Sequence, residues 1–101
     1  MSNSEQAIEE KIVANGLTAP RLTPDMIDDS VFSSEYHVFK GRLTVCCMTL
    51  ANGFMVTGES SCVSVENFDE ALGQKIAFDN ARDKIWMLEG YLLRQRLHEK
   101  G

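Results

Sequence analysis

The side chains that could recognise a small anionic ligand lie mostly in the C-terminal third of the chain. Arg94 and His98 are four positions apart and Tyr91 precedes Arg94 by three, so a helix would place all three on one side. Asn80 lies earlier in the same segment, and Arg42 opens an apolar run near the middle of the chain. A guanidinium group binds phosphate through paired hydrogen bonds, and an aromatic ring can stack on a base. These residue types favour ligand binding, although any one of them, taken alone, is more often solvated or ion-paired.

No set of residues indicates catalysis. The two histidines, His37 and His98, have no obvious serine or cysteine partner in the sequence. Carboxylates at helical spacing, such as Asp79 and Asp83, are typical of solvated helix faces. The glycines are too scattered for a phosphate-binding loop. We therefore expect a protein that is not an enzyme and that carries no cofactor.

The three cysteines predict neither a disulfide framework nor a metal site. Their odd number argues against a secreted, disulfide-bonded protein. Cys46 and Cys47 are adjacent, so a strand would point them to opposite faces, which does not suit a single metal ion. There is also no apolar run of about 18 residues and no signal-peptide pattern. These features predict reduced, partly buried thiols and a cytoplasmic protein without a membrane segment.

Acidic residues are concentrated at the start of the chain, which has a net charge of −5. Residues 1–35 hold seven acidic and two basic side chains, and residues 36–101 hold eight of each. A nucleic-acid-binding surface would need a basic patch, so this distribution argues against one. It does not exclude a small anionic ligand, which needs only two or three well-placed arginines or lysines.

The pattern of elements predicts a single α+β domain over residues 1–101. Residues 1–34 form an acidic helical leader, with a short helix over 4–15 and a second helical turn that begins at Thr23-Pro24. The apolar residues Met26, Ile27, Val31 and Phe32 would line the buried side of that turn. Residues 35–62 form a small antiparallel sheet of three to four strands, and residues 64–99 form a long C-terminal helix or helix pair that packs on it.

The dipeptide Asn52-Gly53 between two apolar runs is a strong hairpin signal. A two-residue turn there predicts strands over 42–51 and 54–62, after a first strand over 35–39 and a turn at 40–41. It also sets the register, with Cys47 opposite Gly58. Both faces of such a sheet would carry apolar side chains. The long helix would cover one face, and only the N-terminal helix or a second subunit is left to cover the other. We therefore expect a homo-oligomer, a dimer or larger.

The C-terminal segment predicts a helix with an unusually wide apolar face. Ser64 is a plausible N-cap, and apolar residues at 77, 81, 85, 88 and 92 form one continuous stripe. Trp86, Leu93 and Leu97 form a second stripe beside it. A face this wide indicates burial against the sheet on one side and against a partner on the other.

Four spaced segments resemble a family of small tailed-phage and prophage proteins of the gene 49 / gene 66 type. They are residues 50–63 (LANGFMVTGESSCV), 66–69 (ENFD), 73–77 (GQKIA) and 84–93 (KIWMLEGYLL). The resemblance covers about residues 42–97 and leaves the acidic first 35 residues outside it. It extends to the Thoeris anti-defence proteins of the first type, phage proteins that sequester cyclic ADP-ribose isomers made by bacterial immune enzymes.

The resemblance implies a non-enzymatic, oligomeric binding protein in the host cytoplasm, whose ligand is a cyclic ADP-ribose isomer or a cyclic oligonucleotide. It implies that aromatic and Asn side chains contact the nucleoside and that Arg side chains contact the phosphates. The corresponding residues here are Arg42, Phe68, Asn80, Tyr91, Arg94 and His98. Two alternatives stay open: a small phage early protein that binds a host protein, and a structural domain with neither role.

Overall fold

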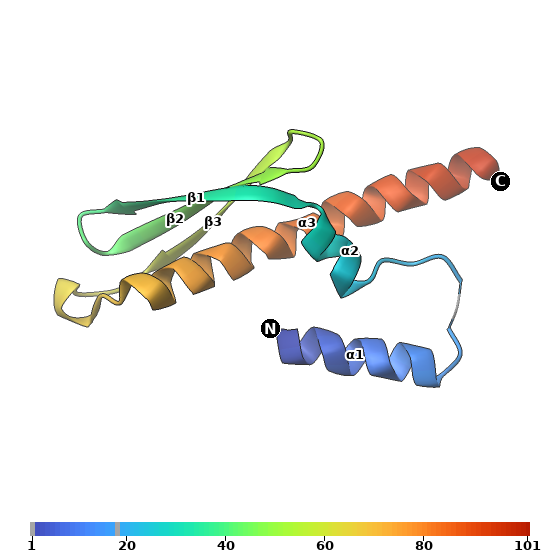
Figure 1. Ribbon diagram of the computed structural model, residues 1–101, viewed down its shortest axis with the longest axis horizontal. Coiled ribbons are helices and arrows are strands. Elements are labelled where there is room, and N and C mark those ends of the chain that lie inside the picture. The colour runs from blue at the N-terminus through green and yellow to red at the C-terminus, as the bar shows by residue number, and fades with distance from the viewer. Residues whose placement is uncertain (1, 18) are drawn as a thin grey trace.

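The computed structural model describes residues 2–17 and 19–101, and it confirms the predicted α+β class (Figure 1). The molecule is elongated, with extents of 53 × 30 × 18 Å. Its elements, in order, are α1 (Ser2–Ala14), α2 (Pro24–Asp29), β1 (Val31–Phe39), β2 (Leu43–Leu50), β3 (Met55–Ser61), the 3-10 helix η1 (Val65–Asn67) and α3 (Glu70–Lys100). The sheet has three strands and the C-terminal region has one long helix in the described part of the chain, so the alternatives of a fourth strand and a helix pair are wrong.

The three strands form an antiparallel meander in the order β1-β2-β3, and the first half of α3 covers one face of it. The second half of α3 projects beyond the sheet, as Figure 1 shows. The sheet begins earlier than predicted, because Val31 pairs with Leu50 at the end of β2. Val31 and Phe32 therefore belong to a strand and not to the preceding helical turn, where local pattern alone had placed them. Phe32 is 77% exposed.

The predicted register of the β2–β3 hairpin is wrong by one residue. The turn contains three residues, 51–53, and Leu50 bonds to Phe54 across it, with its amide 2.8 Å from the Phe54 carbonyl. Only Gly53 has a positive φ, 91°, in this turn. A three-residue loop with glycine in the left-handed position is the next commonest hairpin connection after the two-residue type. As a result Cys46, and not Cys47, lies opposite Gly58.

The two-residue geometry occurs instead in the β1–β2 turn. Lys40 and Gly41 both have positive φ, 53° and 65°, as a type I′ turn requires. The Arg42 amide closes this turn on the Phe39 carbonyl at 3.1 Å. The turn predicted at residues 40–41 is thereby confirmed, and it places Arg42 at the corner where β2 begins.

The core lies between α3 and the alternating inward side chains of the sheet. On β2 every second residue is buried, from Thr44 to Leu50. The buried apolar residues are Ile27, Cys46, Met48, Leu50, Val56, Ala77, Ala81 and Ile85. The predicted stripe on the long helix is buried at 77, 81 and 85, but Leu92 is 37% exposed. The second half of α3 projects beyond the sheet, so side chains there have no sheet to pack against.

Local capping explains where the helices begin. Thr23 caps α2 by accepting a hydrogen bond from the Met26 amide at 3.3 Å, and Pro24 occupies the first position, as predicted. Ser64 does not cap the long helix. It precedes η1, and the extended Phe68 separates η1 from α3. Asp69 caps α3 instead, accepting from the Leu72 amide at 3.0 Å, so the long helix begins at Glu70 and not at the predicted Ser64.

The face of the sheet opposite α3 is open in the described part of the chain. Phe39 at its β1 side is 48% exposed and Met55 at its β3 side is 52% exposed. Glu35, His37 and Glu59 share this face, so it is mixed rather than purely apolar. The homo-oligomer predicted from the sequence stays a prediction.

Gly58 generates the first testable prediction, because α3 lies directly against it. A Cβ atom there would overlap the Ala77 carbonyl oxygen and the Ala81 amide nitrogen, both of them backbone atoms that cannot rotate away. We expect Gly58→Ala to lower the free energy of unfolding by about 1–3 kcal/mol or more, a fall in melting temperature that scanning calorimetry would resolve.

Gly90→Ala is the matched control. It lies inside α3, and the nearest side chain to its added methyl group would be Leu22, at an ordinary 3.7 Å. Alanine has the higher helix propensity by about 1 kcal/mol, so this variant should be at least as stable as the parent. Equal melting temperatures for the two variants would contradict the close packing of α3 on β3.

Candidate functional site

Two hollows in the structure could receive another molecule. The first, the N-cap pocket, is a hollow of about 160 Å³ at the start of α3. Among its lining residues are Arg42, Thr44, Ser60, Asn67, Phe68 and Gly73. The second, the interhelix cavity, is an open space of about 940 Å³ between α1, α2 and α3. Its carboxylates belong to Glu5, Glu9, Glu10, Asp25, Asp28 and Asp79, and its cationic groups belong to Lys75 and Arg82.

The N-cap pocket brings together two residues that the sequence analysis selected, Arg42 and Phe68. Arg42 stands at the corner before β2, and the chain leaving β3 returns to it, where the Cys62 amide bonds to the Arg42 carbonyl at 2.9 Å. From there η1 turns the chain, so that Phe68 lines the pocket on the side of α3. A cationic fork and an aromatic ring thus share one small hollow, the combination suited to a phosphate-bearing ring system.

Thr44 supplies an unsatisfied polar atom to the same pocket. The residue is 1% exposed, and its hydroxyl has no hydrogen-bond partner in the described structure. The absence of a side chain at Gly73 lets α3 lie close to the Thr44 hydroxyl, because a Cβ atom at Gly73 would approach that hydroxyl to 2.9 Å. A buried hydroxyl without a partner costs about 1–3 kcal/mol.

The charge of the N-cap pocket is balanced rather than strongly positive. Its cation is Arg42, and the α3 N-terminus adds partial positive charge from backbone amides. Asp69 also lines the pocket, but its carboxylate accepts from the Leu72 amide as the helix cap. The pocket therefore suits a single phosphate or a polar ring edge better than a highly charged anion.

The other four predicted ligand residues lie elsewhere in the chain. The Asn80 side chain donates to the carbonyl of Glu59 at 2.8 Å and so fastens α3 to the edge strand. Tyr91, Arg94 and His98 are exposed on the projecting half of α3. Since a helix rises about 1.5 Å per residue, Arg94 lies roughly 35 Å along α3 from the end that forms the N-cap pocket. One chain therefore cannot bring all six residues to one ligand.

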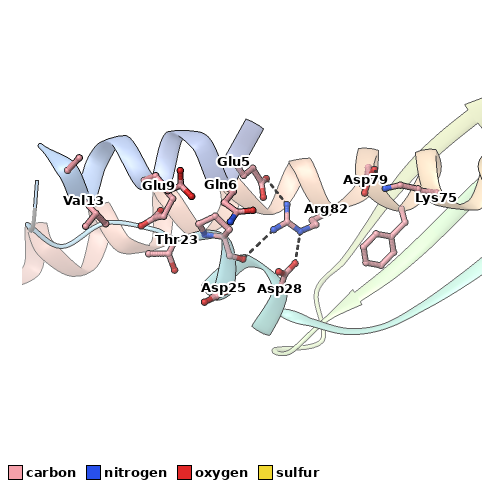
Figure 2. A pocket seen from close by; sticks show the side chains of 14 residues that line it. Glu5, Gln6, Glu9, Val13, Thr23, Asp25, Asp28, Lys75, Asp79 and Arg82 are labelled. Carbon is pink, nitrogen blue, oxygen red and sulfur yellow. Dashed lines mark hydrogen bonds and ion pairs between the residues drawn. The ribbon is translucent and has the colours of Figure 1, made fainter. Parts of the chain in front are cut away.

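The interhelix cavity centres on Arg82, a residue that the sequence analysis did not select (Figure 2). Arg82 is only 9% exposed, and its guanidinium group donates to Glu5 at 2.6 Å, to Asp28 at 2.7 Å and to the Pro24 carbonyl at 3.3 Å. Burial alone would lower the pKa of Arg82, but the hydrogen bonds and charges of Glu5 and Asp28 outweigh it and raise that pKa. The cluster joins α1, α2 and α3.

Sequence patterns offered little signal for this cluster. Glu5 and Arg82 are 77 positions apart, and both occur among many charged residues of ordinary helical spacing. The one indication of this cluster was the position of Arg82 beside the apolar stripe of the helix. A partly buried arginine needs an anionic partner. The acidic leader was the obvious source of that partner, although its pairing could not be read from spacing.

Metal-ligating and reactive groups offer no further site in residues 2–17 and 19–101. No group of three or more His, Cys, Asp or Glu side chains there is arranged to hold a metal ion. All three cysteines are free in the structure. Cys46 is buried and the other two are half-buried, which matches the predicted burial. Burial raises the pKa of the Cys46 thiol and so lowers its reactivity. None of the helices in this described part is long and apolar enough to span a membrane.

The fold and the N-cap pocket define a small α+β protein with a hollow suited to part of a ring-bearing, phosphate-bearing molecule. The chain belongs to the phage protein (N4 Gp49/phage Sf6 gene 66) family, whose model matches residues 22–97. The match begins earlier than the resemblance over 42–97 indicated, so that α2 and β1 lie inside the family region and α1 lies outside it. No curated protein and no solved structure gave a match.

Thr44→Val tests whether the buried hydroxyl lacks a partner. Because valine has nearly the same shape and no polar atom, we expect the free energy of unfolding in urea to rise by about 1 kcal/mol. Thr57→Val, on the exposed face of β3, is the control and should change it by less than about 0.5 kcal/mol. Destabilisation by Thr44→Val would mean that the hydroxyl is already hydrogen-bonded, for example to an ordered water.

Asp83 generates a pH-dependent prediction. Asp83 is exposed on α3, yet partial desolvation, followed by the negative charges of Glu5 and Asp79, raises its pKa above the ordinary 3.8, although Arg82 acts in the opposite direction. A raised pKa in the folded state means that the ionised form of Asp83 is disfavoured there. The protonated form therefore stabilises the fold fully below the ordinary pKa, and this stabilisation is lost as the pH rises. Because solvent screens the charges around an exposed carboxylate, Asp83→Asn should melt at only a slightly higher temperature than the parent at pH 7. The difference should shrink as the pH falls to about 4, and a pH-independent difference would contradict the assignment.

Proposed function

We propose that this phage-family protein is a non-enzymatic binding protein that sequesters a small cyclic nucleotide-type signal, a cyclic ADP-ribose isomer or a cyclic oligonucleotide. Such a protein would act in the host cytoplasm as an anti-defence sponge of the Thoeris type. The observation that carries the proposal is the N-cap pocket, which Arg42 and Phe68 line together. The resemblance to the sponge proteins supports it independently.

Each lining residue has a definite part in this proposal. The ring of Phe68 stacks on a base, which is worth about 1–3 kcal/mol per base. The Arg42 guanidinium binds one phosphate of the ligand, with support from the positive end of α3. Ser60 and Asn67 offer hydroxyl and amide groups to a ribose or a base edge. A protein that only binds its ligand and does not convert it needs no catalytic base or nucleophile, and the proposal assigns none.

The size of the pocket supports a ligand shared between two chains. Pockets that hold a whole small molecule usually measure about 300–1,000 Å³, whereas the N-cap pocket measures about 160 Å³. One chain could therefore hold a single nucleoside or phosphate of a cyclic ligand. A second copy would supply the remainder, and Tyr91, Arg94 and His98 on the projecting half of α3 are exposed and available for that contact.

A second candidate function, an interaction module for a host protein, is favoured by a different observation. The interhelix cavity is lined by six carboxylates and two cationic side chains. A basic segment of a host protein would complement this excess of negative charge. Pull-down from host lysate with the intact protein would retain such a partner at low salt and release it at high salt, whereas a sponge would retain none.

Thermal shift and calorimetry with defined ligands test the sponge proposal. We expect a cyclic ADP-ribose isomer, or one member of a cyclic-dinucleotide panel, to raise the melting temperature. A ligand at one hundred times its Kd adds about 2.7 kcal/mol to the free energy of unfolding. Phe68→Ala and Arg42→Gln should each weaken binding about tenfold or more, the loss expected when one stacked base or one charged hydrogen bond is removed. Native mass spectrometry would give the ratio of ligand to chains.

Arg96→Gln is the matched control for Arg42→Gln, because Arg96 is an exposed arginine outside the N-cap pocket. It should bind ligand as the parent does. Arg94→Gln tests the shared site: it should weaken binding only if the projecting half of α3 reaches a second chain's ligand. Absence of any thermal shift across the whole panel would refute the sponge proposal.

A further inference from the structure

The N-terminal helix α1 is held to the body of the protein by polar contacts and not by the core. Within the described residues, none from α1 belongs to the buried cluster, and Ile8 and Val13 are 60% and 64% exposed. The interhelix cavity of about 940 Å³ separates α1 from much of α3. In Figure 1 α1 lies apart from the sheet. Its attachment must therefore be found among a few side chains.

Two carboxylates of α1 make the described polar contacts with the rest of the chain. Glu5 bonds to Arg82 at 2.6 Å and accepts from the Trp86 indole N–H at 2.9 Å, both through the same oxygen. Glu9 pairs with Arg21 in the segment before α2, at 2.9 Å. The first pair is the more buried: the side chains of Arg82 and Glu5 are 11% and 16% exposed, against 28% and 26% for Arg21 and Glu9.

Arg82 and Trp86 form a preorganised receptor for one carboxylate. They are four positions apart on α3, so they project from the same side of the helix. Asp28 and the Pro24 carbonyl fix the other two nitrogens of the guanidinium group, which leaves one nitrogen directed toward Glu5. The indole N–H supplies a second donor to the same oxygen. Because both donors bind the carboxylate group alone, a carboxylate from another chain could occupy the same position.

We propose that Arg82 and Trp86 form a carboxylate-binding site for the acidic N-terminal helix, that Glu5 fills it from the same chain here, and that the site also accepts Glu5 from a second copy. The helix α1 is then a detachable arm that covers one side of α3 when bound and exposes it when released. This inference does not rest on the sponge proposal, because α1 lies outside the family region and outside the N-cap pocket.

The chemistry of the site selects the arm of a second copy as the occupant in trans. The group already seen in the site is a glutamate on a helix, and every copy carries that helix. The effective concentration of the tethered arm reaches about the millimolar range for a short connection, so it outcompetes a free arm. Exchange between chains therefore requires that the internal glutamate be removed or that copies be brought together by another contact.

Trans-complementation in the full-length protein tests the proposal. Glu5→Gln removes the site's own carboxylate, and a fluorescein-labelled peptide of residues 2–17 supplies the arm from outside. We expect fluorescence anisotropy to show about tenfold or more tighter binding of this peptide to the Glu5→Gln protein than to the parent, because the tethered competitor is weakened. A peptide carrying the same Glu5→Gln change should bind about tenfold or more weakly than the native peptide, since it lacks the charge. Trp86→Phe in the Glu5→Gln protein, which removes the indole N–H donor together with part of the ring, should also weaken binding.

Hydrogen exchange in the same protein variants tests the internal contact. Amides of residues 4–14 should exchange about tenfold or more faster in Glu5→Gln than in the parent, while amides of α3 and the sheet keep their protection. Glu9→Gln, which breaks the more exposed pair, is the control and should accelerate exchange less. Unchanged protection of α1 in Glu5→Gln would overturn the proposal. It would also be overturned if α1 opened and the native and substituted peptides bound equally, or neither bound.

Discussion

Close packing of one helix on one sheet is the constraint on which the rest of this structure depends. Gly73, Ala77 and Ala81 are spaced four apart and form a ridge of small residues along α3. The ridge meets Thr44 at its start and Gly58 farther along, where backbone lies on backbone. Because no side chain separates the two elements at Gly58, the helix cannot slide along the sheet without a clash. The position of every other functional group on α3 follows from this contact.

The same contact creates both of the polar sites. Gly73 places the start of α3 over Thr44, so that the chain leaving β3 must fold around Arg42 and Phe68, which form the N-cap pocket. The next residue after the ridge, Arg82, projects toward α2, where α1 reaches it. A small domain buries a limited apolar core, and here polar clusters fasten the elements that this core does not hold.

Periodicity predicted the elements well, because it is a property of each segment by itself. The cap at Thr23 and the turn at Lys40-Gly41 were equally local and equally predictable. The register of the β2–β3 hairpin was not, for two reasons. Asn-Gly fits a two-residue and a three-residue turn, and β2 carries apolar side chains on both faces, Val45 as well as Met48, so the pattern could not select the buried one.

The candidate site was predictable in its residue types but not in its grouping. Arg42 and Phe68 meet only because β3 returns the chain to the start of β2, and Glu5 meets Arg82 across 77 positions of sequence. Tertiary contacts of this kind leave no local pattern.

Three surfaces of the chain lack a partner among the described residues, and a second chain could cover them together. The sheet has an open face among the described residues, the N-cap pocket is too small for a whole ligand, and the second half of α3 projects beyond the core with Tyr91 76% exposed. A helical half with little packing is stable mainly because it continues a helix that the sheet supports, since helix formation is cooperative. One further contact, a second chain laid along α3, would cover that half and bring Arg94 to the neighbouring pocket. The predicted oligomer and the proposed binding function are therefore a single hypothesis about the same helix.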